Sequence, residues 1–182
     1  ERLTIYEALL REWQQRMNLV GPRTLEDAWS RHFFDSAQLL ALFPEWARVH
    51  VDLGSGAGFP GLVLAIMGTG RTHLVESDQR KASFLAEVAK ATDAPAEIHP
   101  VRAESLKKMK ADVVTARALA PMKRLFPLVK PFCLKGSVAI LPTGQHVDDE
   151  LTECAIPANI RVDRIPSRSD PRGAILRLDG WI

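Results

Sequence analysis

Residues 49–61 read V-H-V-D-L-G-S-G-A-G-F-P-G, an apolar run followed by a turn that contains four glycines. The run V-H-V-D-L has the length and β-branched content of a buried strand. Gly54, Gly56 and Gly58 lack a Cβ atom, so the turn can adopt positive φ and a ligand can approach the main chain closely. Pro60 then starts a helix where its missing N–H costs nothing. The stretch predicts a strand, a ligand-binding turn and a helix.

Strand-like and helix-like patterns alternate along the rest of the chain. Strands are expected at residues 49–53, 72–76, 96–101, 111–116, 137–141, 159–165 and 174–178, and helices at 60–67, 79–92, 122–133 (kinked or broken at Pro127) and 147–154. This alternation is typical of a parallel sheet with helices on both faces. Only S-R-S-D-P-R-G joins the last two strands, which suits a hairpin. The predicted fold is α/β, with a mostly parallel seven-stranded sheet and an antiparallel last strand.

The first 46 residues are predicted to form a helical cap. Apolar side chains recur there at helical spacing, namely Leu3, Tyr6, Leu9, Leu10, Trp13 and Met17. Gly21-Pro22 should end this helix, and Thr24 should cap a second helical segment that runs to Leu42 with a break near Arg31. The chain is therefore expected to be a single domain, residues 1–182, with a cap over 1–46 and a core over 47–182.

Composition excludes several classes of protein. The 182 residues are 46% hydrophobic, and 24 Lys and Arg against 22 Asp and Glu give a charge of +2, so any nucleic-acid binding depends on where the charges lie. Cys133 and Cys154 lack metal-binding spacing and are expected to be thiols in a reducing cytoplasm. His73 and His99 look structural, and no metal site is expected. Without a signal peptide or a transmembrane run, the pattern predicts a cytoplasmic protein, with nothing requiring more than a monomer.

Two motifs compete for the glycine turn. From Gly56, G-A-G-F-P-G fits the dinucleotide pattern G-x-G-x-x-G. From Asp52, the same residues read D-x-G-x-G-x-G, which resembles the first motif of S-adenosylmethionine-dependent methyltransferases. The dinucleotide reading would extend the strand through Gly54 and Ser55, which are poor strand formers, so the second reading is favoured. Glu76 ends the next strand, where a carboxylate can accept ribose hydroxyls in either class. Asp52 is expected to accept N–H groups of the turn.

Further motifs extend the resemblance over most of the chain. They are W-Q-Q-R-M-N-L-V (13–20), R-H-F-F-D-S (31–36), D-L-G-S-G-A-G-F-P-G (52–61), L-V-E-S-D-Q-R-K-A-S-F-L (74–85), R-A-E (102–104), A-R-A (116–118) and G-Q-H-V-D-D-E-L (144–151). With these motifs the chain resembles the bacterial 16S rRNA guanine-N7 methyltransferases, also called glucose-inhibited division protein B. The family commonly has Lys before the glycine that corresponds to Gly144, whereas Thr143 stands here.

The resemblance implies a Rossmann-like class I methyltransferase that transfers the methyl group of S-adenosylmethionine to N7 of one guanine in 16S rRNA, free or in the small ribosomal subunit. The implied cofactor residues are Gly54, Ser55, Gly56, Gly58, Phe59, Glu76, Ser77, Ala103, Glu104 and Arg117. Glu76 would hold the ribose, and Ala103 and Glu104 would meet the adenine. Arg117, beside the methyl donor, is the one candidate catalytic residue.

Guanine N7 carries a lone pair and no proton, so methyl transfer needs alignment and no general base. Arg117 follows a predicted strand, and its planar guanidinium can fix a phosphate or the guanine O6 edge. The alternative is a salt bridge from Arg117 to Asp112 or Glu104.

Substrate RNA is expected to contact six residues at the carboxyl edge, namely Arg31, His32, Lys123, Arg124, Arg168 and Arg172. In R-H-x-x-D, Arg31 can hold a phosphate while Asp35 orients His32, or these residues can form a structural network between the cap and the core. The four later basic residues can equally be a solvated surface.

Two other functions stay open. An NAD-dependent oxidoreductase would use the G-x-G-x-x-G motif, but 182 residues leave no room for a substrate domain. A catalytically silent module that senses S-adenosylmethionine and binds RNA is kept open by Thr143.

Overall fold

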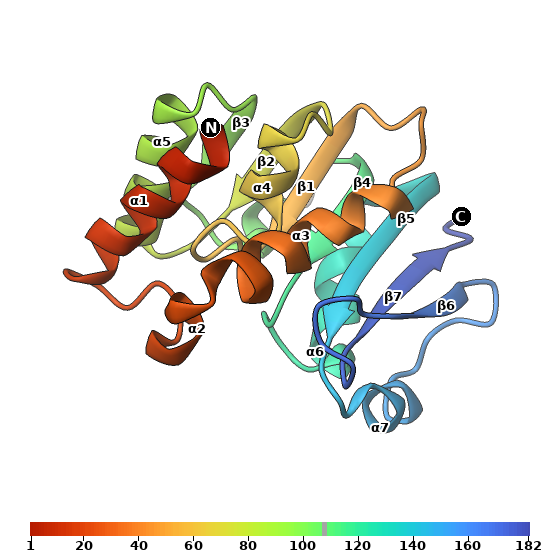
Figure 1. Ribbon diagram of the computed structural model, residues 1–182. Helices are drawn as coiled ribbons and strands as arrows, with labels where there is room; N and C mark the ends of the chain where they lie inside the picture. The colour runs from red at the N-terminus through yellow and green to blue at the C-terminus, as the bar shows by residue number, and fades with distance from the viewer. Residues whose placement is uncertain (107–108) are drawn as a thin grey trace.

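The computed structural model describes residues 1–106 and 109–182. Seven strands form one sheet in the order β3-β2-β1-β4-β5-β7-β6 (Figure 1). Their bounds are β1 Val49–Leu53, β2 Arg71–Val75, β3 Ala96–His99, β4 Ala111–Ala116, β5 Cys133–Thr143, β6 Arg161–Pro166 and β7 Ala174–Asp179. Strands β1 to β5 are parallel, and β7 is antiparallel to both β5 and β6. The predicted sheet is confirmed, and the antiparallel strand lies inside it, next to β5.

Five helical segments precede the sheet: α1 Arg2–Gln14, α2 Pro22–Glu26, the π-helix η1 Trp29–Phe34, α3 Asp35–Ala37 and the 3₁₀-helix η2 Gln38–Leu42. The others are α4 Gly61–Ile66, α5 Gln79–Ala91, η3 Ala103–Leu106, α6 Met122–Val129, η4 Lys130–Phe132 and α7 Val147–Thr152. The predicted helical cap is confirmed. Its break lies at Asp27, where φ is -113° and ψ is 46°, and Arg31 lies inside the π-helical turn that follows. None of the described helices is long and apolar enough to cross a membrane.

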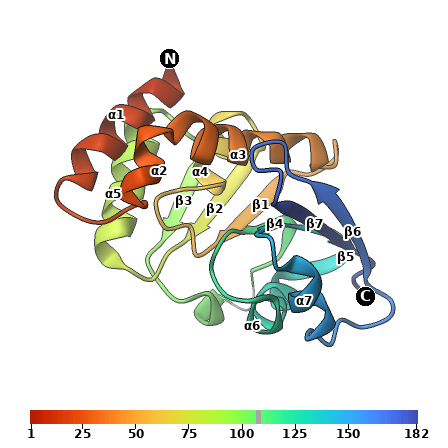
Figure 2. The same ribbon diagram turned by 60° about the horizontal axis from the view of Figure 1, so that its bottom comes forward.

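The sheet lies between two layers of helices (Figure 2), and an apolar cluster fills the space on each face. On one face, α1 packs with α4 and α5, and Tyr6, Leu10 and Phe84 are fully buried in this layer. On the other face, α6 and α7 cover β1 and β4, with Met122 and Phe126 in the core. Because both faces are covered, the central strands bury apolar residues such as Leu74 and Val75 and also polar ones such as His50 and Asp52.

Several predicted boundaries are wrong for local reasons. Helix α1 ends at Gln14, because the Gln14 side chain accepts the N–H groups of Leu19 and Val20, so Met17 lies outside the helix. Helix α2 begins directly after Gly21, and Thr24 lies inside it, donating its hydroxyl to the Gly21 carbonyl. The early start follows from the proline at the first helical position.

Three other boundaries differ. Pro60 is the cap residue before α4, and the helix itself starts at Gly61. Helix α6 continues past Pro127 and ends at Val129, followed by a 3₁₀ turn. Strand β5 starts at Cys133, ahead of the predicted residue 137, and its pairing with β4 shifts register near this end.

The topology fixes where a ligand can bind. Strand β1 lies between β2 and β4, so the chain leaves β1 toward one half of the sheet and later returns to begin the other half. In an open α/β sheet, ligands bind beyond the carboxyl ends of the strands at this reversal. The glycine turn follows β1 directly and therefore lies at this position.

Candidate functional site

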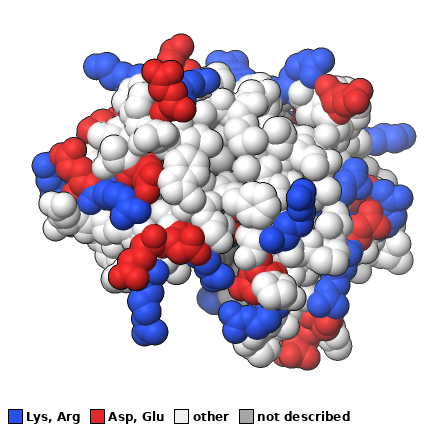
Figure 3. Space-filling model, in the orientation of Figure 1, with Lys and Arg blue, Asp and Glu red and all other residues white. Residues whose placement is uncertain are grey.

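A cleft opens at the carboxyl edge of the sheet. Its volume is about 1090 Å³, and it is lined by the loops after all five parallel strands, by the helical cap and by the β6–β7 hairpin. In the view of Figure 1, positive and negative side chains are mixed over the surface, and a hollow lies in its lower half (Figure 3). The predicted cofactor residues that line the cleft are Gly54, Ser55, Gly56, Phe59, Glu76, Ser77, Ala103, Glu104 and Arg117. Gly58 is the one predicted cofactor residue that does not line it.

The three glycines of the turn all have positive φ, but their surroundings differ. A Cβ atom on Gly54 would overlap the Leu119 side chain, and one on Gly58 would overlap the Tyr6 hydroxyl. A Cβ atom on Gly56 would meet only the Gly54 carbonyl oxygen, at 3.8 Å. Gly56 is thus the glycine that leaves space open in the cleft, whereas Gly54 and Gly58 allow protein groups to pack.

Two acidic side chains hold the glycine turn. Glu76 is 8% exposed; its Oε2 accepts the Gly56 N–H at 2.8 Å and its Oε1 accepts the Asp78 N–H at 2.8 Å. Asp52 is fully buried and accepts the Thr115 hydroxyl at 2.6 Å and the Gly61 N–H at 3.3 Å. Burial raises the pKa of Asp52 to about 6, although the Thr115 hydrogen bond lowers it. The prediction that Asp52 orients the turn is confirmed.

Arg117 connects the core to the helical cap. It follows β4, and its guanidinium donates to Asp35 Oδ2 at 3.0 Å and to the Arg31 carbonyl at 3.4 Å. It also lies 5.2 Å from the centroid of the Phe59 ring, a cation–π distance. The alternative partners Asp112 and Glu104 are wrong, because Asp112 instead accepts backbone N–H groups at the start of β1.

His32 lies next to Arg117 and is 8% exposed. Its Nδ1 is 3.4 Å from the Arg117 guanidinium, its Nε2 is 2.9 Å from the Thr24 hydroxyl, and its ring stacks on Phe59. Burial, followed by the positive charge of Arg117, lowers the pKa of His32 to about 4. The imidazole is therefore neutral near pH 7.

The predicted orientation of His32 by Asp35 is wrong, because Asp35 bonds elsewhere. In addition to the Arg117 guanidinium, the Asp35 carboxylate accepts the Gln38 amide N–H at 3.1 Å and the Ser169 hydroxyl of the β6–β7 hairpin. The contacts of the structural alternative for R-H-x-x-D are present, because Asp35 pairs with Arg117 and Arg31 pairs with Asp170, while the phosphate contact of Arg31 stays a prediction. Sequence reasoning missed Ser169 because, in S-R-S-D-P-R-G, only the hairpin turn and the basic residues Arg168 and Arg172 were considered.

The predicted RNA residues divide into two groups. Arg31, His32 and Arg172 line the cleft, and Asp170 pairs with Arg31 at 3.3 Å and with Arg172 at 3.4 Å. The other three, Lys123, Arg124 and Arg168, are exposed and do not line the cleft. Two further basic residues that were not predicted, Lys81 and Arg102, line it.

Sequence comparison identifies the family. The model of a family described as rRNA small subunit methyltransferase G (GidB) matches residues 1–166. The chain belongs to this family. The Ribosomal RNA small subunit methyltransferase G of Rhodospirillum centenum is 56% identical over 178 residues, covering 98% of this chain and 82% of the relative. That of Rhodospirillum rubrum is 54% identical over 178 residues, covering 98% of this chain and 89% of the relative.

Solved structures agree on the fold. An O-methyltransferase from Bacillus cereus in complex with SAH has a TM-score of 0.68 at 13% identity and covers 97% of this chain and 90% of its own. A mutant of MtNAS in complex with S-adenosylmethionine has a TM-score of 0.65 at 16% identity, covering 100% of this chain and 72% of its own. The predicted Rossmann-like methyltransferase fold and the predicted family are both confirmed, and the oxidoreductase alternative is not favoured.

Proposed function

We propose that this GidB-family protein transfers the methyl group of S-adenosylmethionine to N7 of one guanine in 16S rRNA. The observation that carries this proposal is the glycine turn at the sheet reversal. Of Gly54, Gly56 and Gly58, only Gly56 has open cleft where its Cβ atom would be. A cleft of about 1090 Å³ is large enough for a nucleoside cofactor together with a flipped-out base. Family membership supports rRNA as the substrate.

The residues of the cleft fit this cofactor. Gly54 and Gly56 would lie along its amino-acid and ribose parts, with Phe59 beside them, and Ser77, Ala103 and Glu104 near the adenine. Glu76 would accept ribose hydroxyls through lone pairs that its two backbone N–H partners leave free. Ser55 and Gly58 act indirectly, because Ser55 donates to the Asp52 carbonyl and Gly58 makes room for Tyr6.

The reaction requires no proton acceptor from the protein. Bound S-adenosylmethionine would supply an electrophilic methyl group on a sulfonium, which the N7 lone pair of guanine could accept without loss of a proton while the sulfur keeps the electrons of its former bond. The protein's task is to hold the base in line, which is worth on the order of 7 kcal/mol of barrier. Arg117 is suited to this task because Asp35 and the Phe59 ring fix its guanidinium beside the glycine turn.

RNA binding is assigned to basic residues around the cleft. Arg31, His32 and Arg172 would contact the nucleotide that enters, and Lys123, Arg124 and Arg168 would contact phosphates farther out. Asp170 pairs with both Arg31 and Arg172, so it orients the two guanidinium groups and partly offsets their positive charge. The enzyme is expected to act as a monomer in the cytoplasm, where its substrate, the small ribosomal subunit or its rRNA, is found.

The test combines transfer with position. Small subunits from cells that lack this methylation are incubated with the protein and labelled S-adenosylmethionine, and the methylated base is located by borohydride and aniline cleavage, which is specific for N7-methylguanine. Label at one N7 position is expected. Cofactor binding without transfer would support the silent module instead, and label on another atom would contradict the N7 assignment.

The role of Arg117 is tested in the same assay. Arg117→Ala should bind S-adenosylhomocysteine within about twofold of the parent but transfer methyl roughly 100-fold more slowly, because loss of alignment costs rate more than affinity. Arg164→Ala is the matched control, since Arg164 is exposed and pairs with Asp148. Transfer by Arg117→Ala at the parent rate would show that Arg117 has been assigned the wrong role.

A further inference from the structure

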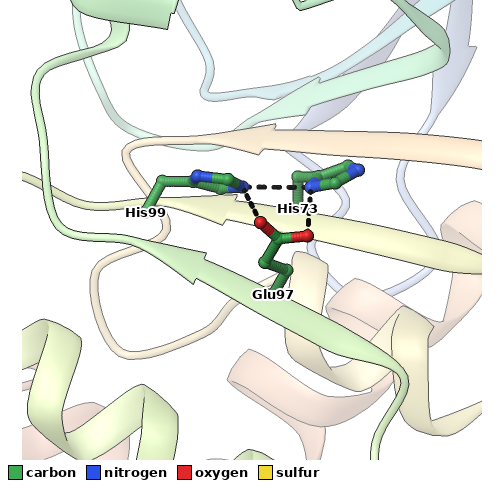
Figure 4. Close-up of side chains that lie close together, drawn as sticks. All are labelled: His73, Glu97 and His99. Carbon is green, nitrogen blue, oxygen red and sulfur yellow. Dashed lines mark hydrogen bonds and ion pairs between the residues drawn. The ribbon is translucent and has the colours of Figure 1, made fainter.

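Three side chains of types that can bind metal ions lie close together at the edge of the sheet (Figure 4). The proposed methyl transfer does not use them. His73 belongs to β2, and Glu97 and His99 belong to the edge strand β3. The parallel register pairs His73 with Glu97 and Val75 with His99. Because residues two apart on a strand share a face, all three side chains lie on the same face of the sheet.

The distances between these side chains match a metal site. His73 Nδ1 lies 3.0 Å from His99 Nε2, and the Glu97 carboxylate lies 3.6 Å from the first nitrogen and 3.7 Å from the second. Zinc bonds of about 2.0–2.1 Å in a tetrahedral centre separate two ligand atoms by about 3.3–3.4 Å. The two rings need to move apart by only a few tenths of an ångström, and the carboxylate oxygens need to come closer by about as much. Within the described parts of the chain, no other group of His, Cys, Asp or Glu meets the same condition.

The environment also suits a cation. The side chains of His73 and His99 are only 10% and 15% exposed, whereas Glu97 is 52% exposed, so the imidazoles are held by the sheet and the carboxylate faces solvent. Solvent can therefore supply the remaining ligand. Arg71 is the nearby competing charge, 3.6 Å from Glu97, but its side chain is 71% exposed and free to turn into solvent. Two imidazoles and one carboxylate favour Zn²⁺, Ni²⁺ or Cu²⁺ over Mg²⁺ or Ca²⁺.

We propose that His73, Glu97 and His99 form a three-ligand site for a zinc-class divalent cation that fastens β3 to β2. Strand β3 has only four residues and a single neighbour in the sheet, so it gains most from such a link. The His99 carbonyl also accepts the N–H of Glu76 at 3.1 Å, and the chain runs from His99 to Ala103 and Glu104 of the cleft. A bound cation therefore stabilises the edge from which the adenine side of the cleft extends. Methyl transfer itself needs no metal.

The test uses untagged, full-length protein stripped with EDTA. Titration with ZnCl₂ and NiCl₂ should show one equivalent bound and a rise in Tm, whereas MgCl₂ should produce neither. Co²⁺ should give visible d–d absorption when it occupies the site. No binding of any of these transition ions would overturn the proposal and leave His73 and His99 as a simple hydrogen-bonded pair.

Variants assign the ligands. His99→Ala and Glu97→Gln should each weaken Zn²⁺ binding at least tenfold and abolish the rise in Tm, with far-UV circular dichroism confirming the fold. Glu97→Gln keeps the test decisive if His99→Ala folds poorly, because Glu97 is half exposed and its side chain is not part of the core. His146→Ala is the control. His146 is exposed near α7, so its substitution should change neither Zn²⁺ binding nor the rise in Tm. Loss of binding in His146→Ala, with retention in both ligand variants, would place the cation elsewhere.

Discussion

At the scale of single residues, the glycine turn separates two functions that its sequence pattern merges. Gly56 and Gly58 both have positive φ, but one faces open cleft and the other faces the Tyr6 hydroxyl and Leu62. The sequence predicted that glycine is needed at both positions. It did not predict which glycine serves the ligand, because Tyr6 is more than fifty positions away in the chain and reaches the turn only through the tertiary fold.

Substitution of the two glycines should affect different properties, namely cofactor binding at Gly56 and stability at Gly58. Gly56→Ala should retain most of its stability, losing about 1–2 kcal/mol to its positive φ, but should bind S-adenosylhomocysteine at least tenfold more weakly. Gly58→Ala should lose about 3 kcal/mol of unfolding free energy, because backbone strain adds to overlap with packed side chains. Urea denaturation and calorimetric titration measure the two effects. Gly136→Ala is the control, since Gly136 has the similar φ of 92° with nothing near its Cβ position.

His50 should make stability depend on pH. It is buried, with Nε2 2.8 Å from the Thr115 hydroxyl, and burial lowers its pKa from 6.5 to about 3. The unfolded chain takes up a proton near pH 6.5, before the folded chain does. The contribution of neutral His50 to the free energy of unfolding is therefore complete above pH 6.5. It is lost as pH falls toward 3, at up to about 1.4 kcal/mol per pH unit.

His50→Gln keeps a hydrogen-bonding side chain but does not titrate. The stability of this variant relative to the parent should therefore rise as pH falls from 6.5 to 4. Urea denaturation at several pH values measures this difference. The raised pKa of Asp52 has the opposite effect, since a carboxyl that stays protonated in the fold stabilises at low pH, but it acts in both proteins and cancels. A constant difference between the two proteins across this range would show that His50 titrates normally in the fold. His146→Gln should track the parent, because His146 is exposed.

At the scale of elements, the sheet was predictable and the cap boundaries were not. The strands β1, β2 and β4 stand out in the sequence as short segments rich in Val, Leu and Ala between helical patterns, although they also contain buried polar residues such as His50, Thr72 and Thr115. The cap depends on side-chain contacts that periodicity does not encode. Gln14 ends α1 by accepting two N–H groups, and Arg117 finds Asp35 across 82 positions of sequence.

Helix α1 supports the glycine turn through one hydroxyl. Tyr6 is fully buried and donates to the Ala57 carbonyl within the turn. Tyr6→Phe leaves that carbonyl without its partner, which should cost about 1–3 kcal/mol of unfolding free energy and weaken cofactor binding, because the turn loses a support. Denaturation and calorimetry measure both effects. Ser83→Ala is the control. It removes an exposed hydroxyl that bonds only within its own helix, so it should change neither stability nor cofactor affinity. Unchanged cofactor affinity in Tyr6→Phe would show that the turn does not rely on α1.

At the scale of the whole molecule, we propose that the cap over residues 1–46 and the core over 47–182 unfold as one domain. Tyr6, Leu10 and Phe33 of the cap share an apolar cluster with Leu74 and Phe84 of the core. Neither part can bury these side chains alone, so their unfolding should be coupled. Periodicity predicted the apolar face of α1 but not its partner, because amphipathic patterns show that a face is buried without showing against what.

A single transition in urea is the expected result. Trp13, Trp29 and Trp46 report on the cap by fluorescence, and far-UV circular dichroism reports on the whole chain. The two signals should have the same midpoint. An earlier fluorescence change would mean that the cap unfolds on its own, and Trp181→Phe, which removes the one core tryptophan, makes the comparison specific to the cap.

The clamp made by Glu76 affects how quickly a nucleoside is captured. Its two oxygens already hold Gly56 and Asp78 in the chain described here, so the turn has its final shape before any ligand arrives. Little ordering remains for the encounter, and association should run at a rate set by diffusion into the cleft. Differences in affinity among cofactor analogues should then appear almost wholly in their residence times.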